Sequence, residues 1–311
     1  MVDVFIVGEP KSGTTALASF LSDHPDVALS NPKEPHFFAT DSIRESDEFH
    51  GGKKRHFEIR TKAAYENCFA HAKSGQLTID ASTHYLVSKE AAKNISEYNP
   101  GAKVIILLRE PVGFLQSLHQ QYVNNGSEDV ADFEAAFTLQ QERAQGNQLP
   151  KHTRCPSHLQ YSQRICYLDH IERFYNVFPK QSVLVLLHED FKQDNSGTYQ
   201  HVLNFLNLKT PASQPEFAHV HGAKAPRNAA IHGLLNLPFF KQTLRRLLSP
   251  QTYDKLKHLS VSLFFKPAKK ATLNPAFKAR LHELAKPEVI KLDNRLKHLN
   301  IATKWGYDTH S

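Results

Sequence analysis

Short continuous apolar runs alternate along this chain with longer stretches whose apolar residues recur at helical spacing. Such runs lie at residues 5–7, 27–29, 104–108 and 183–187, and the mixed segment 76–80 also reads as a short strand. The run at 104–108 is rich in β-branched residues, as a strand covered on both faces should be. The helically spaced stretches begin near Leu17 and at Pro111 and cover residues 87–99, 161–178 and 199–208. This alternation predicts the α/β class, in which an open parallel sheet is flanked by helices.

The turn between the first predicted strand and the first predicted helix is rich in Gly, Ser and Thr. It reads Gly8-Glu9-Pro10-Lys11-Ser12-Gly13-Thr14-Thr15. Unpaired backbone N–H groups and the helix macrodipole both favour negative charge at such a place. Lys11 adds a cation, and the hydroxyls of the loop add hydrogen-bond donors. The sequence therefore predicts an anion-binding loop.

The glycine spacing of this loop resembles that of a nucleotide-triphosphate P-loop, with one departure. Gly8 and Gly13 stand where the two glycines of G-x-x-x-x-G-K-[ST] belong, but Thr14 replaces the lysine that follows. That lysine normally contacts the β- and γ-phosphates. We therefore expect the loop to hold a phosphate but not a Mg²⁺-triphosphate of the usual kind. A helix-capping turn without a ligand is the alternative.

Two segments of the chain resemble motifs of the sulfotransferases that use 3′-phosphoadenosine 5′-phosphosulfate (PAPS). Residues 10–17 resemble the family's 5′-phosphosulfate loop, and residues 104–111 followed by Ser117 resemble its 3′-phosphate motif. The resemblance implies a P-loop-like fold with PAPS as co-substrate. It also implies that the 5′-phosphosulfate is bound by Lys11, Ser12, Gly13, Thr14 and Thr15, and the 3′-phosphate by Arg109 and Ser117.

The spacing of the second motif is consistent with that role. Arg109 ends a predicted strand, and Pro111 pre-sets the first turn of the helix that follows. Ser117 lies about two helical turns further on, so both side chains could reach one anion. A structural salt bridge of Arg109 is the alternative.

A candidate general base lies between two prolines. Pro32 and Pro35 force extended backbone around Glu34, and we expect partial desolvation to raise the pKa of its carboxyl. The segment resembles the Glu-x-His-Phe-Phe element of glycosaminoglycan-type and many bacterial sulfotransferases, in which the glutamate deprotonates the acceptor. His36 would then position the acceptor or the glutamate. A surface acid in a loop is the alternative.

His84 is the competing base. Residues 80–86 resemble a family element at the carboxyl end of a strand, and phenol and steroid sulfotransferases place a catalytic histidine in a comparable segment. One histidine among 19 can equally be structural. Ala81 stands where glycosaminoglycan enzymes often carry a catalytic lysine. Asp80 could be the Walker-B aspartate of a kinase, but the missing loop lysine argues against that reading.

The remainder of the chain resembles the family's later segments. The basic loop at 219–228 resembles the one that closes over the nucleotide, which implies that Lys224 and Arg227 contact the 3′-phosphate from a second side. Solvated loop cations are the alternative. Since the resemblance covers most of the chain, we expect residues 1–311 to form one sulfotransferase domain. Cap segments at about 124–160 and 229–280 are expected to cover the acceptor cleft.

Composition limits the remaining classes. Lys and Arg number 38 and Asp and Glu 31, a net charge of +7 that suits an anionic ligand, and no nucleic-acid-binding motif accompanies it. The three cysteines include no C-x-x-C, so neither a disulfide framework nor a metal site is predicted. Without a signal peptide or an apolar run of about 18 residues, we expect a cytoplasmic protein with no membrane span.

The resemblance implies that the chain is a sulfotransferase. It would move a sulfuryl group from PAPS to a hydroxyl or amine of a small-molecule or carbohydrate acceptor, without a metal. Glu34 would be the general base, and Lys11 would stabilise the leaving phosphate. Two alternatives stay open: a P-loop-type small-molecule kinase and a catalytically inactive nucleotide-binding interaction protein.

Overall fold

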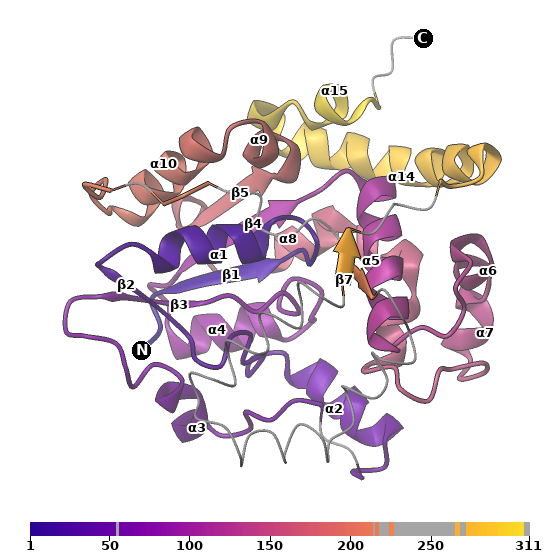
Figure 1. The fold of residues 1–311 in the computed structure, drawn as a ribbon, viewed down its shortest axis with the longest axis horizontal. Helices are drawn as coiled ribbons and strands as arrows, with labels where there is room; N and C mark the ends of the chain where they lie inside the picture. Colours follow the sequence, from indigo (N-terminus) through magenta and orange to yellow (C-terminus); the bar gives the residue numbers. More distant parts are fainter. Residues whose placement is uncertain (54–55, 214, 218–223, 227–264, 268–271, 308–311) are drawn as a thin grey trace. The chain divides into compact units, whose positions relative to one another are not determined.

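The computed structural model of the chain describes residues 1–53, 56–213, 215–217, 224–226, 265–267 and 272–307 (Figure 1). The chain divides into two compact units, one of Met1–Phe217 with Asn274–Ser311 and the other of Ala218–Leu273. The second unit contains an antiparallel pair of strands, β6 (Lys224–Pro226) and β7 (Phe265–Pro267). All elements named below belong to the first unit. The single-domain organisation over 1–311 stays a prediction.

Five parallel strands form the sheet of the first unit, in the order β2-β3-β1-β4-β5. They are β1 (Val4–Gly8), β2 (Val27–Leu29), β3 (Leu77–Asp80), β4 (Lys103–Leu108) and β5 (Val183–Leu187). Every residue of β1 is buried, and so is every residue of β4 after Lys103. Such continuous burial is what apolar strands need when helices cover both faces of a sheet. The α/β fold and the five strands predicted from the sequence are confirmed.

Helices cover both faces of this sheet (Figure 1). Those near the strands are α1 (Thr14–Ser22), α4 (Ala91–Tyr98), α5 (Pro111–Asn125), α8 (Tyr167–Tyr175), α9 (His188–Gln193) and α10 (Asn195–Leu206). The β1–β2 and β3–β4 connections run in opposite directions across the sheet, so right-handed crossovers place α1 and α4 on opposite faces. Helix α8 packs against α4. Phe191 of α9 packs edge-on against Phe20 of α1, which places α9 on the other face.

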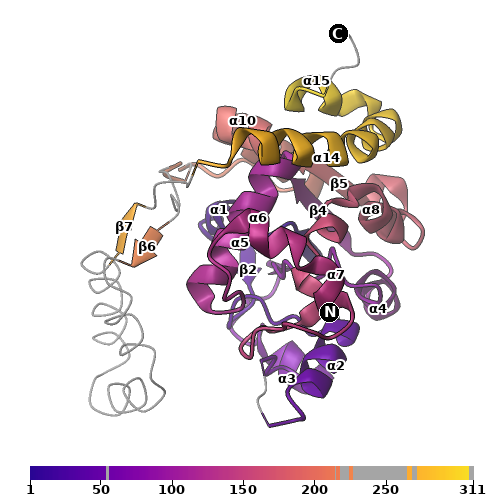
Figure 2. The same cartoon turned by 90° about the vertical axis from the view of Figure 1, so that its right-hand side faces the viewer.

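Shorter helices and the carboxyl-terminal helices complete the unit. They are α2 (Thr40–Phe49), α3 (Lys62–Asn67), α6 (Phe133–Thr138), α7 (Gln140–Ala144), α14 (Pro275–Arg295) and α15 (Ile301–Trp305), with 3-10 turns η1 (Pro156–Leu159), η2 (Tyr161–Ile165), η3 (Lys180–Ser182) and η4 (Lys297–Leu299). Helix α14 packs against α5 and α8 (Figure 2). None of the helices described here is both long and apolar enough to cross a bilayer.

One predicted helix is divided in the structure. The apolar spacing over 161–178 predicted a single helix, but the backbone forms the 3-10 turn η2, breaks at Cys166 and continues as α8. The break matters for the site because Arg164 of η2 is buried and points toward the first loop of the sheet, where it pairs with Glu9.

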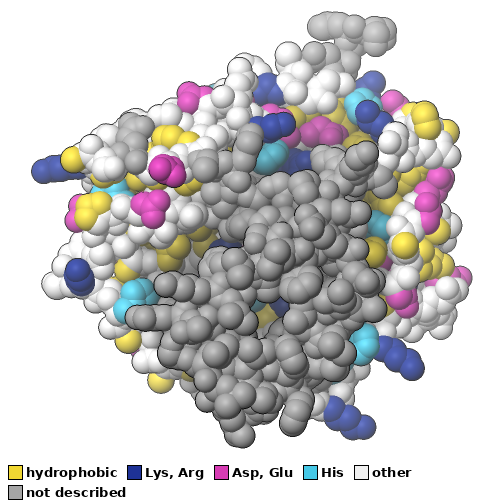
Figure 3. All heavy atoms as spheres, in the orientation of Figure 1, with side chains coloured by type: hydrophobic (Ala, Val, Ile, Leu, Met, Phe, Trp, Pro, Cys, Tyr) yellow, Lys and Arg dark blue, Asp and Glu magenta, His cyan; other side chains and the backbone are white. Residues whose placement is uncertain are grey.

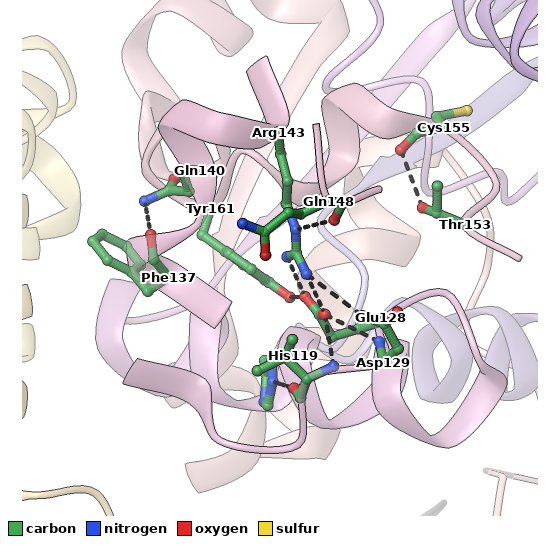
Figure 4. Close-up of polar contacts among 11 residues, drawn as sticks. His119, Glu128, Asp129, Phe137, Gln140, Arg143, Gln148, Thr153, Cys155 and Tyr161 are labelled. Carbon is green, nitrogen blue, oxygen red and sulfur yellow. Dashed lines mark hydrogen bonds and ion pairs between the residues drawn. The ribbon is translucent and has the colours of Figure 1, made fainter. Parts of the chain in front are cut away.

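The segment 124–160 is organised around a buried ion pair (Figure 4). The Arg143 guanidinium of α7 donates to both carboxylate oxygens of Glu128, at 2.6 and 2.7 Å. The Tyr161 hydroxyl of η2 donates to the same carboxylate at 2.9 Å. These contacts join α7 and the turn after α5 to η2. Burial raises the pKa of the Glu128 carboxyl, but the hydrogen bonds from Arg143 and others outweigh it and lower the pKa overall.

Acidic and basic side chains are interspersed on the face of the molecule drawn in Figure 3, among the atoms that carry a colour there.

Candidate functional site

The predicted site residues of the first unit follow the carboxyl ends of adjacent strands. The anion-binding loop follows β1, Asp80 ends β3, and Arg109 comes directly after β4. Because β3, β1 and β4 are parallel neighbours, these ends meet at one edge of the sheet.

Both glycines of the first loop are required by its geometry. Gly8 has a φ of +149°, and a Cβ there would lie 2.7 Å from the Cβ of Leu86. Gly13 has a φ of +100° and caps α1 without a side-chain hydrogen bond to the helix. A Cβ at Gly13 would lie 2.9 Å from the Phe191 ring. The loop can therefore keep its path only with glycine at both positions.

Two cationic side chains meet at this loop. Arg109 donates from Nη1 to the carbonyl oxygen of Lys11 at 2.9 Å. Burial lowers the pKa of the Lys11 ammonium, and the nearby Arg109 charge lowers it further. The hydroxyl of Ser12 is buried and has no hydrogen-bond partner among the residues that the structure describes. Adjacent cations, a buried hydroxyl without a partner and a helix N-terminus suit a phosphate group.

The other predicted binding residues lie around this loop or outside the described residues. Thr14 and Thr15 form the first turn of α1, with Thr14 buried and Thr15 exposed. Ser117 is half-buried on α5. Lys224 is the first residue of β6 in the second unit, and Arg227 lies outside the described residues. Contact of these two side chains with a 3′-phosphate stays a prediction.

Glu34 lies in a loop that turns sharply, so the extended backbone expected between Pro32 and Pro35 is wrong at this residue. Its φ is +59° and that of His36 is +55°. One carboxylate oxygen of Glu34 lies 3.5 Å from Nε2 of His36, and the other lies 3.4 Å from Nζ of Lys33. Lys33 Nζ also donates to the Thr15 hydroxyl at 2.8 Å. Lys33 thus links the loop of Glu34 to the loop between β1 and α1, a contact that the sequence motifs did not indicate.

The sequence-based expectation of a raised Glu34 pKa is wrong. Burial does act to raise the pKa of this carboxyl, but the contacts with His36 and Lys33 outweigh it, and the pKa is lowered. Glu34 is therefore ionised at neutral pH, as a proton acceptor has to be.

His84, the competing base, lies next to the same loop. Its ring stacks on that of His36 with a centroid distance of 4.4 Å, and the His158 ring of η1 meets it edge-on at 4.8 Å. Burial is the main cause that lowers the pKa of His84 well below its ordinary value, and the nearby guanidinium groups of Arg154 and Arg164 lower it further. His84 is thus uncharged at neutral pH. His158 comes from segment 124–160, and no motif marked it in advance.

A buried ion pair holds the loop between β1 and α1 at Glu9. Glu9, fully buried, accepts a hydrogen bond from Nη2 of Arg164 at 2.8 Å, and its backbone N–H donates to the carbonyl of Leu107 at 2.7 Å. Burial raises the pKa of Glu9 in spite of the Arg164 charge. This pair ties the loop to η2 and was not expected from the sequence.

Asp80 does not present its carboxylate to a metal ion. It is fully buried, and hydroxyl groups of Tyr65, Ser82 and Tyr85 donate to it. Within the part of the chain that the structure describes, no group of three or more His, Cys, Asp or Glu side chains is arranged to hold a metal ion. The Walker-B interpretation of Asp80 therefore has no support from its geometry.

Comparison with known proteins identifies the family. The sulfotransferase domain model matches residues 2–221. The chain therefore belongs to the sulfotransferase domain family, and the family predicted from the sequence is confirmed.

Individual relatives agree with this assignment. The chain is 30% identical over 216 residues to human heparan sulfate glucosamine 3-O-sulfotransferase 6, and this alignment covers 68% of the chain and 54% of that protein. It is 26% identical over 211 residues to human bifunctional heparan sulfate N-deacetylase/N-sulfotransferase 3, covering 65% of the chain and 22% of that protein. The chain thus spans about half the length of the first relative and about a fifth of the length of the second.

A solved structure of a sulfotransferase from Alicyclobacillus acidocaldarius shares the fold. It superposes with a TM-score of 0.61 at 25% identity, covering 82% of this chain and 99% of the other. The P-loop-like α/β fold expected from the sequence is therefore shared by a solved member of the family.

Proposed function

We propose that this protein transfers a sulfuryl group from PAPS to a hydroxyl or amine of a carbohydrate acceptor. The observation that carries the proposal is that the loop after β1 is in contact with Arg109 on one side and, through Lys33, with the loop of Glu34. Arg109 donates to the Lys11 carbonyl oxygen, and Lys33 contacts both Thr15 and the Glu34 carboxylate. The heparan sulfate names of the relatives support a carbohydrate as acceptor.

Each residue has a role in this proposal. The loop at 11–15 binds the 5′-phosphosulfate through backbone N–H groups, hydroxyls and the Lys11 ammonium. Arg109 and Ser117 bind the 3′-phosphate. The buried hydroxyl of Ser12, which has no hydrogen-bond partner among the described residues, fits the role of the loop at 11–15, because an oxygen of the 5′-phosphosulfate would give it a partner.

The reaction moves one proton and one sulfuryl group. Glu34 accepts the proton of the acceptor as the acceptor oxygen or nitrogen forms its bond to sulfur. The bond between sulfur and the 5′-phosphate oxygen breaks, and its electron pair leaves with 3′-phosphoadenosine 5′-phosphate (PAP). Lys11 stabilises the negative charge that grows on that oxygen. His84, neutral and adjacent to His36, is the second candidate for the base.

Transfer of radioactive sulfate from PAPS to heparan sulfate oligosaccharides tests the proposal. We expect Glu34→Gln to lower turnover by about 10²- to 10⁴-fold with unchanged PAP affinity, since it removes the proton acceptor alone. The matched control is Glu97→Gln on α4, whose carboxylate is 64% exposed. Wild-type turnover in Glu34→Gln would contradict the base assignment and favour His84.

Each of two alternative functions predicts a different result when the same protein is tested with PAP, with PAPS and with ATP. Tight binding of PAP with no transfer by the wild-type protein to any oligosaccharide would favour a nucleotide-binding interaction protein. Phosphate transfer from ATP with Mg²⁺ would favour a kinase. The cytoplasmic location stays a prediction that this experiment does not address.

A further inference from the structure

We propose that Asp80 is a positioning residue that holds the loop of Glu34 in its active geometry through the hydroxyls of Ser82 and Tyr85. This inference rests on the proposed role of Glu34 as the base. Asp80 touches neither Glu34 nor the phosphate-binding loop, so it acts through other residues.

The Asp80 carboxylate organises a buried set of hydroxyl groups. Ser82 Oγ donates to Oδ1 at 2.6 Å, and Tyr85 Oη donates to Oδ2 at 2.7 Å. Tyr65 Oη, from α3, also donates to Oδ2, at 3.0 Å. All four side chains are at most 2% exposed. A carboxylate that accepts these bonds fixes the direction of each O–H, and so leaves each hydroxyl oxygen free to accept from elsewhere.

Two of these hydroxyls accept hydrogen bonds from the loop of Glu34. The backbone N–H of His36 donates to Ser82 Oγ at 3.0 Å, and that of Phe38 donates to Tyr85 Oη at 3.5 Å. The Asp80 carboxylate therefore sets the position of two backbone groups that lie two and four residues after Glu34.

This support matters because the loop has an unusual backbone. Glu34 and His36 both have left-handed φ values, +59° and +55°, which non-glycine residues adopt only when their surroundings fix them. The same geometry brings Nε2 of His36 to 3.5 Å from the Glu34 carboxylate. Loss of the Ser82 contact should release the His36 backbone and separate these two side chains.

The experiment measures the pKa of Glu34 in the full chain by carbon-13 NMR, with Glu34→Gln to assign the signal. We expect Ser82→Ala to shift the Glu34 pKa upward, because the loop no longer holds His36 against the carboxylate. Tyr65→Phe is the matched control. It removes one hydrogen bond from Asp80 but neither backbone contact, and it should leave the Glu34 pKa at the wild-type value. Asp80→Asn should shift it in the same direction as Ser82→Ala.

Calorimetric titration with PAP separates positioning from general structural support. Ser82→Ala should bind PAP like the wild type. An unchanged Glu34 pKa in Ser82→Ala, an equal shift in Tyr65→Phe, or loss of PAP affinity in Ser82→Ala would each overturn the inference. If Asp80→Asn fails to fold, Ser82→Ala still decides. Full sulfate transfer by Glu34→Gln would contradict the base assignment alone, so the two claims can fail separately.

Discussion

At the scale of single residues, the side chains next to Glu34 determine how it titrates. Burial alone would raise the pKa of this carboxyl, and the sequence argument considered only that effect. His36 and Lys33 reverse the sign, because each brings a hydrogen-bond donor or a positive charge to within 3.5 Å. The family resemblance suggested that His36 positions Glu34, but residue types and spacing did not give the sign of the resulting pKa shift, which depends on how closely both side chains approach the carboxylate.

The lowered pKa of Glu34 has a measurable consequence for activity. If Glu34 is the base, as proposed, it must be deprotonated, so turnover should be full above the Glu34 pKa and fall as the pH decreases through it. The acid limb of the turnover profile should therefore lie below the ordinary glutamate value of about 4.3. In His36→Ala the limb should move to higher pH, because the effect of burial remains while the strongest opposing contact is removed.

A comparison variant sharpens this result. Lys33→Ala should also move the limb upward but by less, because Lys33 lowers the Glu34 pKa less than His36 does. The profiles are recorded as turnover against pH at saturating PAPS. A limb that stays in place or moves to lower pH in His36→Ala would contradict this account of Glu34.

At the scale of secondary-structure elements, most of the sheet could be predicted from the sequence. Short apolar runs were sufficient to locate most of the buried parallel strands, and the two glycines were sufficient to locate the tight turn between β1 and α1. Anion binding by that turn stays a prediction. The division of 161–178 into η2 and α8 could not be predicted. In the structure, Arg164 of η2 is buried against Glu9, a contact between segments far apart in the chain that residue spacing does not indicate.

The ion pair between Glu128 and Arg143 gives a prediction at this scale. Arg143→Leu should destabilise the protein by about 3–5 kcal/mol, because it leaves the Glu128 carboxylate buried without its partner. The double variant Glu128→Leu with Arg143→Leu should lose less. Chemical denaturation followed by circular dichroism measures both.

The exposed pair between Arg44 and Glu90 provides the control. Its side chains are 60% and 38% exposed, so Arg44→Leu should leave the denaturation midpoint close to the wild-type value. Equal losses in Arg143→Leu and Arg44→Leu would contradict a structural role for the buried pair.

At the scale of the whole molecule, the site joins residues from distant parts of the first unit. Motifs indicated Lys11, Arg109, Glu34 and His84 separately, and the parallel strand order explains why they lie at one edge. The supporting contacts of Asp80 and Arg164 could not be predicted, because buried hydrogen-bond networks depend on side-chain packing in three dimensions. The resemblance to the family supplied the identity of the nucleotide, which residue spacing alone left open between a phosphosulfate and a triphosphate.

The most direct test of the central claim is calorimetric titration of the full chain with PAP and, separately, with adenosine 5′-phosphate. If the loop at 11–15 and the pair Arg109 and Ser117 bind one nucleotide, loss of the 3′-phosphate should cost about 3 kcal/mol, or about 10²-fold in affinity. Lys11→Ala should weaken both ligands, and Arg109→Ala should reduce the advantage of PAP. Equal affinities of the wild-type protein for PAP and adenosine 5′-phosphate, or tighter binding of ATP with Mg²⁺ than of PAP, would contradict the account.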